Sequence, residues 1–269
     1  MTAWFRDLHP AGGTAAPPRP LPPDGPAPAA LRLYCFPHAG GSAGAYTALA
    51  RELAASGRPG APLGRVAVAA AQYPGRQDRY RERPWEDVGA VADVLAAEIR
   101  ARGEHPYALF GHSMGAVVAY ETARRLRRSP GPGPARLFVS GRDAPSTGPV
   151  ATDDVRDDEA LLAHVRRLGG TGGRVLDEPE LLAMALPALR ADYRALRSYA
   201  WAPGEPLDCP LTVLVGDADP LVTDAGAAAW RGLSASTTTI RLLRGGHFYL
   251  DDRVREVAEL VREALPVPV

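Results

Sequence analysis

The sequence has little cysteine, which excludes two kinds of scaffold at once. Among its 269 residues only Cys35 and Cys209 are cysteines, and they lie far apart in the chain. Two such cysteines supply neither a disulfide framework nor the paired spacing of a zinc site. We therefore expect free thiols in a reducing compartment, and a fold stabilised by a buried apolar core.

The sequence also contains no lysine, and its net charge is zero. All 31 basic residues are arginine, and 31 acidic residues balance them. We attribute the missing lysine to codon bias in a GC-rich genome. A neutral chain has no overall field that attracts nucleic acid or anionic membranes. We therefore expect neither as a partner, and look for the function in a local site.

Long apolar runs are absent as well, although 46% of the residues are hydrophobic. No run approaches the ~20 residues of a membrane-spanning helix. The first residues, "MTAWFRDLHPAGG", lack the apolar core of a signal peptide. We predict a cytoplasmic protein, monomeric and without a membrane segment.

Proline, glycine and alanine dominate residues 10–30, which show no apolar periodicity. Such a segment cannot offset the entropy of ordering by burial. We predict a flexible Pro-rich leader over residues 1–30, in which Trp4 and Phe5 can dock onto the body. The folded domain is predicted over residues 31–269.

Within that domain, short apolar runs alternate with helical patterns. The expected strands cover residues 31–36, 65–72, 107–111, 135–141, 211–217 and 237–246. The expected helices cover 45–55, 86–102, 114–128, a segment that ends at Trp230, and 252–264. This alternation predicts an α/β fold with a mostly parallel sheet and helices on both faces.

Residues 144–206 carry helical patterns alone, which predicts a helical lid over the ligand-binding edge of the sheet. Glycines 169, 170, 172 and 173 are the candidate hinge of this lid.

The stretch "YALFGHSMGAVVAY" (residues 107–120) contains a Ser flanked by glycines, in the form G-x-S-x-G. A strand precedes it and a helix follows, as in the nucleophile turn of α/β-hydrolases. Side chains at 111 and 115 would collide with neighbouring elements, so glycine is needed at both. We predict Ser113 as a nucleophile; the competing interpretation is an ordinary helix cap with Ser113 as N-cap.

A serine nucleophile of this kind needs a base and an acid, which follow it in the order Ser, acid, His. His247 in "RGGHFYL" lies between the last strand and the last helix, where a loop can return it to Ser113. The other histidines considered lie in the leader, in predicted surface segments or inside the turn (His9, His105, His164 and His112). For the acid we choose Asp219, beyond the strand "LTVLVG", and expect Asp217 to bond the turn backbone. Asp143, one strand earlier, stays open as the alternative acid.

Backbone amides must bind the oxyanion formed when such a serine attacks a carbonyl. One donor is the residue after the nucleophile, Met114. The second is expected in the small-residue turn "FPHAGGSAGAY" at 36–46, where Ala39 is the candidate and Gly40 and Gly41 let the backbone approach the substrate. The competing interpretation is an ordinary Gly-rich β-α turn.

Several stretches together resemble the stand-alone type II thioesterases of modular polyketide and nonribosomal peptide synthases, which have the α/β-hydrolase fold. The motifs are "FPHAGGSAGAY", "QYPGRQDR", "FGHSMGAVVAYE", "LFVSGRDAP", "LPALRADYRALRSYAW", "VGDADP" and "GGHFYL". They cover nearly the whole chain from residue 31 onward. By position, the family's triad falls on Ser113, Asp219 and His247, as in the motif interpretation.

This resemblance implies hydrolysis of acyl groups from the phosphopantetheine arm of acyl or peptidyl carrier proteins, which clears stalled or misprimed units. No metal or cofactor is implied, because the phosphopantetheine belongs to the substrate. We expect His38 and Gly40 to contact the substrate, and Met184 and Tyr193 in the lid to line an acyl channel, although helical apolar spacing is also typical of core. The basic residues 124, 125, 127 and 128 are expected to be a solvated helix face, with carrier-protein docking as the alternative.

Two other functions stay open. An acyl transferase or macrocyclising thioesterase would use the same triad with an amine or hydroxyl acceptor. Cyclases are usually the terminal domain of a large synthase, whereas this sequence starts at its own Met1, so hydrolysis is the expectation. A catalytically silent docking protein is the alternative from another class, although it need not retain a triad.

Overall fold

A seven-stranded sheet forms the centre of the computed structural model, which describes residues 3–8, 31–55, 66–103, 106–148, 155, 157–169 and 178–265. The strand order is β1-β3-β2-β4-β5-β6-β7. The strands are β1 (Phe5–Leu8), β2 (Arg32–Phe36), β3 (Ala67–Ala71), β4 (Tyr107–His112), β5 (Leu137–Ser140), β6 (Leu211–Gly216) and β7 (Thr238–Leu243). All pairs are parallel except β1 with β3. The mostly parallel α/β sheet predicted from the apolar runs is confirmed, with every expected strand in place.

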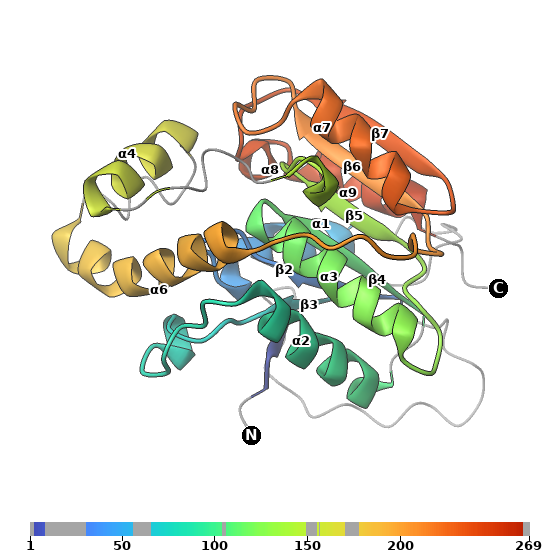
Figure 1. The fold of residues 1–269 in the computed structure, drawn as a ribbon, viewed down its shortest axis with the longest axis horizontal. Helices are drawn as coiled ribbons and strands as arrows, with labels where there is room; N and C mark the ends of the chain where they lie inside the picture. The colour runs from blue at the N-terminus through green and yellow to red at the C-terminus, as the bar shows by residue number, and fades with distance from the viewer. Residues whose placement is uncertain are drawn as a thin grey trace.

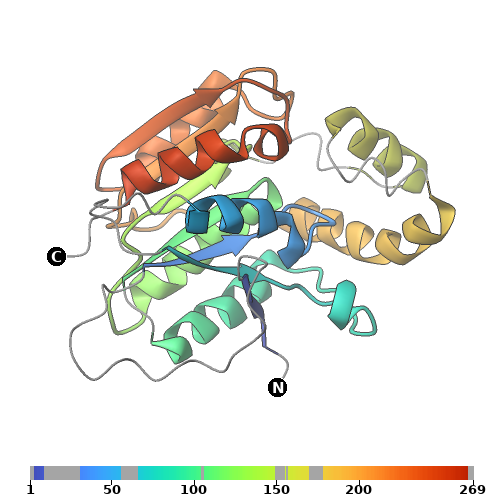
Figure 2. The same ribbon diagram turned by 180° about the vertical axis from the view of Figure 1, so that it is seen from behind.

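Helices cover both faces of this sheet. The α-helices are α1 (Thr47–Ala55), α2 (Val88–Arg102), α3 (Met114–Arg128), α4 (Asp158–Leu168), α6 (Pro179–Ser198), α7 (Asp224–Ala229), α8 (Tyr249–Asp252) and α9 (Val254–Ala264). Short 3₁₀ segments are η1 (Ala43–Tyr46), η2 (Gln77–Arg79), η3 (Pro145–Thr147) and η5 (Trp230–Leu233). Helices α2, α3 and α7 lie on one face (Figure 1), and α1 and α9 on the other (Figure 2).

Two apolar layers follow from the alternation of side chains along each strand. Tyr34 and Phe36 of β2 pack with α2 and α3, whereas Leu33 and Cys35 of the same strand pack with α1 and α9. Because the central strands are buried on both faces, they appear in the sequence as continuous apolar runs. The sheet is therefore a rigid platform whose carboxyl edge carries the loops.

The segment between β5 and β6 stands beside the sheet, as α4 and α6 show in Figure 1. Its described residues are helical or irregular and include no strand, which agrees with the all-helical insertion predicted over 144–206. Leu161 of α4 packs with Leu189 and Tyr193 of α6 in a small apolar cluster of their own. Of the candidate hinge glycines, Gly169 has a positive φ of 74°, and residues 170, 172 and 173 lie outside the described ranges.

The prediction of a flexible leader over residues 1–30 is wrong for residues 5–8. These residues form β1, which pairs antiparallel with β3 so that Phe5 lies opposite Ala71. Phe5 is only 2% exposed because its ring packs on Tyr34 and Phe36. The docking of Trp4 and Phe5 is thus confirmed, and the apolar contact stabilises a strand too short to show periodicity. Residues 9–30 lie outside the described part of the chain.

The helices of the described ranges include none long and apolar enough to cross a membrane.

Candidate active site

Ser113 occupies the turn between β4 and α3 in a backbone conformation that side chains rarely adopt. Its φ is +56° and its ψ is −119°, and its amide donates to the carbonyl oxygen of Ser140 at 2.8 Å. A non-glycine residue at positive φ costs free energy and is typical of functional turns. The residue is 7% exposed. The sequence interpretation of a strained strand-to-helix turn at this serine agrees with the geometry.

The two glycines around Ser113 are required by close backbone contacts. A Cβ on Gly111 would lie 2.1 Å from the carbonyl oxygen of Gly115, and a Cβ on Gly115 would lie 1.9 Å from the carbonyl oxygen of Phe36. Both distances are far below van der Waals contact, and the atoms met are backbone. Helix α3 can therefore approach β4 this closely only when residue 111 lacks a side chain, and β2 only when residue 115 lacks one.

His247 and Asp219 form a buried pair at the same edge of the sheet. The Nδ1 atom of His247 lies 2.9 Å from Oδ2 and 3.1 Å from Oδ1 of Asp219. His247 follows β7 and is 1% exposed; Asp219 follows β6, and its Oδ1 accepts from the Leu221 amide at 2.9 Å. A carboxylate on Nδ1 leaves Nε2 unprotonated, so His247 can act as a general base.

The two competing carboxylates are engaged elsewhere. Asp143 accepts from the amide of Thr223 at 2.9 Å and from its hydroxyl at 3.0 Å, where Thr223 caps helix α7. Asp217 accepts from the amide of Gly245 at 2.8 Å, as expected for a residue that bonds the turn backbone. The structure therefore brings Asp219, and neither of these two residues, to His247.

The candidate oxyanion donors lie at two elements that meet beside Ser113. Met114 is the first residue of α3, so its amide belongs to the group that has no partner within the helix. Ala39 lies in the turn after β2. Among the hydrogen bonds of the described residues, none uses the amide of either. Both amides are available to a ligand, and the N-terminus of α3 favours negative charge there.

Two histidines that were not assigned a catalytic role surround the pair. The His112 ring lies 4.9 Å from the His247 ring, and its Nδ1 is 2.9 Å from the hydroxyl of Ser140, which contacts the Tyr249 hydroxyl at 2.5 Å. Burial, and then the charge of His247, lower the pKa of His112 well below its usual value. The same two causes lower the pKa of His38 to about 4. Both rings are therefore neutral near pH 7.

The expected substrate-contacting residues lie in different surroundings. His38 lies against Phe248, with ring centroids 4.9 Å apart, and Gly40 is exposed with a positive φ of 76°. Tyr193 is buried in the lid cluster, whereas Met184 is 49% exposed on α6. The channel-lining role of these two lid residues stays a prediction, and exposure of Met184 gives it no support.

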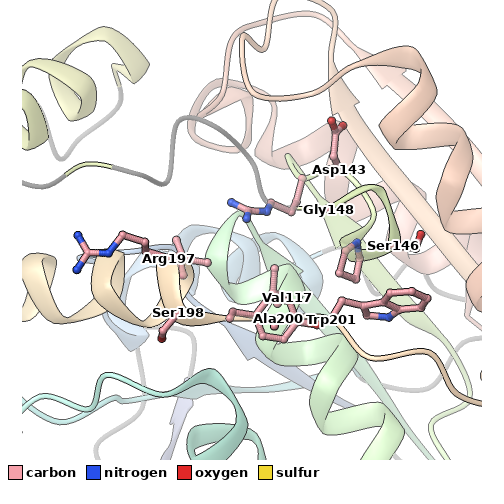
Figure 3. A pocket seen from close by; sticks show the side chains of 12 residues that line it. Val117, Asp143, Ser146, Gly148, Arg197, Ser198, Ala200 and Trp201 are labelled. Carbon is pink, nitrogen blue, oxygen red and sulfur yellow. The ribbon is translucent and has the colours of Figure 1, made fainter.

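A cavity of about 340 Å³ adjoins the sheet edge. Figure 3 shows Val117 of α3, Asp143 and Ser146 after β5, and Arg197 at the end of α6 around it. Val117 lies four residues after Ser113, which places it about one helical turn beyond the nucleophile. The residues that line this cavity include Asp143 but none of Ser113, Asp219 and His247.

The arginines in the C-terminal part of α3 are mostly paired with acids. Arg124 contacts Glu121 at 2.9 Å, Arg125 contacts both Glu121 and Asp93, and Arg127 contacts Asp208 at 2.9 Å. These pairs neutralise much of the local positive charge. A solvated and ion-paired helix face is the simpler interpretation of this cluster.

Comparisons with known proteins agree on one family. The model of the thioesterase domain family matches residues 31–265. A probable cadicidin biosynthesis thioesterase of Streptomyces griseus is 41% identical over 97% of this chain, which spans 66% of that protein's length. Thioesterase PikA5 of Streptomyces venezuelae is 43% identical over 98% of this chain and 86% of its own length.

Solved structures give the same result. The type II thioesterase BorB from the borrelidin biosynthetic cluster superposes with a TM-score of 0.81 at 41% identity, and the match covers 98% of both chains. The RedJ thioesterase from the prodiginine biosynthetic pathway in Streptomyces coelicolor superposes with a TM-score of 0.78 at 40% identity, covering 94% of this chain and 92% of RedJ. The α/β-hydrolase fold expected from the motifs is thus confirmed over nearly the full length.

Proposed function

This chain belongs to the thioesterase family, with relatives among the type II thioesterases of polyketide and nonribosomal peptide biosynthesis, and we propose that it hydrolyses acyl thioesters through Ser113. The observation that carries this proposal is the buried contact of 2.9 Å between His247 and Asp219, at the sheet edge where Ser113 sits in its strained turn. Ser113, Asp219 and His247 follow three strands whose carboxyl ends share one edge of the sheet, in the chain order of α/β-hydrolases.

The first half of the reaction acylates the serine. His247 takes the proton of the Ser113 hydroxyl through Nε2 as the oxygen attacks the thioester carbonyl carbon. Asp219 holds the imidazole in the right tautomer and stabilises its charged form. The amides of Ala39 and Met114 bind the developing oxyanion. When the C–S bond breaks, the thiol leaves with the proton from His247, and the acyl group stays on Ser113.

The second half returns the enzyme to its starting state. His247 removes a proton from water, the hydroxide attacks the acyl-serine carbonyl, and the same amides bind the second oxyanion. Breakage of the ester bond gives the free acid, and Ser113 recovers its proton from His247. This chemistry uses side chains and backbone alone, so we propose that it needs no metal or organic cofactor.

We propose acyl or peptidyl carrier proteins as the partners and their phosphopantetheine-bound acyl groups as the substrates. Support comes from the relatives, whose names place them in cadicidin, borrelidin and yersiniabactin biosynthesis, the last a pathway of nonribosomal peptide and polyketide synthases. The acyl chain is assigned to the cavity beside Val117, with Leu196 and Tyr199 among its apolar walls.

The experiment compares carrier proteins loaded with acetyl, propionyl, malonyl, longer acyl and aminoacyl groups, by kcat/KM and by mass analysis of the product. We expect free acids, and loss of turnover in Ser113→Ala. If only cyclic or amide products were recovered, the acyl transferase or cyclase alternative would replace hydrolysis. If Ser113→Ala kept full turnover, the catalytic assignment would be wrong.

A further inference from the structure

An ion pair buried between the lid and the sheet edge touches the loop that carries Ala39. Arg76 lies in the motif "QYPGRQDR" and Asp192 lies on α6, 116 residues further along the chain. The two guanidinium amino groups donate to the two carboxylate oxygens, each at 2.9 Å. Their side chains are 8% and 5% exposed. No role has been given to this pair by the triad chemistry.

Both members of the pair also bond the backbone on the two residues after Ala39. The Gly40 amide donates to Asp192 Oδ2 at 2.7 Å, and Arg76 Nη1 donates to the Gly41 carbonyl oxygen at 3.0 Å. The Gly41 amide in turn closes on the His38 carbonyl oxygen at 2.9 Å. The peptide units on the C-terminal side of Ala39 are therefore fixed by a charged carboxylate and a charged guanidinium, the strongest class of hydrogen-bonding partner in proteins.

Two other residues of the motif, Gln72 and Tyr73, contact Arg76. Gln72 donates through Nε2 to the Arg76 carbonyl oxygen at 3.0 Å and accepts from the Ala43 amide at 2.9 Å. The Arg76 guanidinium lies over the Tyr73 ring, 5.2 Å from its centroid. The loop after β2 also lies close to the lid helix α6, because a Cβ on Gly40 would lie 2.9 Å from Leu189 of α6. A single arrangement of α6 is thus linked to a single conformation of the loop.

We propose that Arg76 and Asp192 are positioning residues that hold the Ala39 amide in the oxyanion site, and that they make catalysis depend on the seating of α6. This inference rests on the proposed function, in which Ala39 supplies an oxyanion donor. Donors stabilise a transition state only where they are aimed in advance at the developing charge. When α6 moves away, Gly40 and Gly41 lose their charged partners and the Ala39 amide loses its fixed direction.

The test separates positioning from simple structural support. Replacing a buried ion pair by apolar side chains is often neutral for stability, whereas removing one partner leaves a buried charge and is strongly destabilising. The double variant Arg76→Met, Asp192→Leu is therefore expected to keep a melting temperature close to that of the unmodified protein. We expect its kcat on a small acyl thioester to fall about 10- to 100-fold, with KM within about twofold, since one of two oxyanion donors is misplaced.

A matched control lies two residues away on the same helix. Arg190 pairs with Asp158 of α4, with Nε donating to Oδ1 at 2.6 Å. Among the hydrogen bonds of the described residues, none joins either residue to residues 38–41. The variant Arg190→Gln, Asp158→Asn is expected to leave kcat unchanged. As a second variant in case the double one does not fold, Arg76→Lys keeps the charge but loses the bidentate contact, and should lower kcat in the same direction.

Affinity for a trifluoromethyl ketone, which forms an oxyanion when the serine attacks it, gives a second measurement. This affinity does not change when only the stability of the fold changes. We expect it to weaken in the double variant by about the same factor as kcat/KM falls. A folded double variant with full kcat would overturn the inference, and so would a raised KM with unchanged kcat, which would assign the pair to acyl binding. Failure of the proposed function is seen separately, as full turnover by Ser113→Ala.

Discussion

At the scale of single residues, the site depends on positions where the backbone allows no alternative. Ser113 has a φ of +56°, and α3 crosses β2 so closely that Gly115 has no room for a methyl group. Strain of this kind persists only where the surrounding packing enforces it. The buried strands β4 and β2 provide that packing, so the hydroxyl is held at the sheet edge before substrate arrives.

Gly115→Ala tests this crowding. Its Cβ would lie 1.9 Å from the Phe36 carbonyl oxygen, so α3 must shift away from β2. We expect the free energy of unfolding to fall by at least about 2 kcal/mol, and activity to be lost with it. Gly133→Ala is the control, because nothing lies within 4 Å of its Cβ. Urea denaturation of both variants makes the measurement, and equal stability would contradict the account.

The acid of the triad is tested by a pair of isosteric variants. Asp219→Asn is expected to lower kcat by about 10⁴-fold, because the imidazole of His247 loses its tautomer and orientation. Asp143→Asn should change kcat only a few-fold, since Asp143 bonds Thr223 at the start of α7 instead. Steady-state kinetics on one acyl thioester compares them. The reverse order of effects would assign the role to Asp143.

The pH dependence of stability follows from two neutral histidines, His112, which is buried, and His38, which is half-buried. The usual pKa of 6.5 applies to the unfolded chain, whereas burial lowers the pKa of His38 to about 4 and that of His112 well below 6.5. Below pH 6.5 the unfolded state binds protons that the folded state does not. The free energy of unfolding therefore falls as pH decreases through the window from about 6.5 to 4.

We expect a slope approaching ~1.4 kcal/mol per pH unit for each histidine in that window. Urea midpoints at pH 7, 6 and 5 measure it. In His38→Asn the slope should decrease by about one proton's contribution, which provides the control. A midpoint that does not change from pH 7 to 5, or a slope unaltered in His38→Asn, would refute this account of the cluster.

At the scale of elements, β1 shows how a short segment completes the sheet. Its four residues pair with β3, and Arg6 on its exposed side contacts Asp78. Phe5 enters the core between Tyr34 and Phe36, while Trp4 lies under the Arg79 guanidinium. The strand thus joins the core to the motif "QYPGRQDR", which in turn supports the oxyanion loop.

Phe5→Ala is therefore expected to destabilise the protein although it lies near the start of the chain. The ring is 2% exposed, and its loss should lower the free energy of unfolding by about 3 kcal/mol. Arg6→Ala, which removes an exposed ion pair, should cost less than about 1 kcal/mol. Thermal unfolding compares the two variants. Equal small effects would show that β1 contributes little to the core.

The elements with continuous apolar character could be predicted from the sequence. Those that depend on contacts between residues far apart in the sequence were missed. Strands β2 to β6 are buried on both faces over most of their length, so their composition is sufficient to locate them. The edge strand β7 is largely exposed, and its threonines and aliphatic residues locate it instead. The triad candidates follow from the glycines around Ser113 and the strand ends before Asp219 and His247. By contrast, Phe5 acquires its role only when β3 lies beside it. Arg76 and Asp192 lie 116 residues apart, and although both stand in motifs quoted for the family resemblance, nothing in the sequence indicated that they pair.

At the scale of the whole molecule, the parallel sheet assembles the site by bringing strand ends to one edge. Ser113 follows β4, Ala39 follows β2, Asp219 follows β6 and His247 follows β7. Helix α6 covers this edge from the lid, where Asp192 bonds the loop after β2. The triad candidates, the loop with Ala39 and the lid helix thus all lie at the carboxyl edge of the sheet, where ligands bind in open α/β sheets.

The central claim is that the acyl group passes through Ser113 on its way to water. Rapid quenching of a reaction with an acyl carrier protein in ¹⁸O-labelled water, followed by peptide mass mapping, tests it most directly. We predict a transient acyl mass on the peptide that contains Ser113, and one ¹⁸O atom in the released acid. An acyl group found on another residue, or acid released at the full rate by Ser113→Ala, would contradict it.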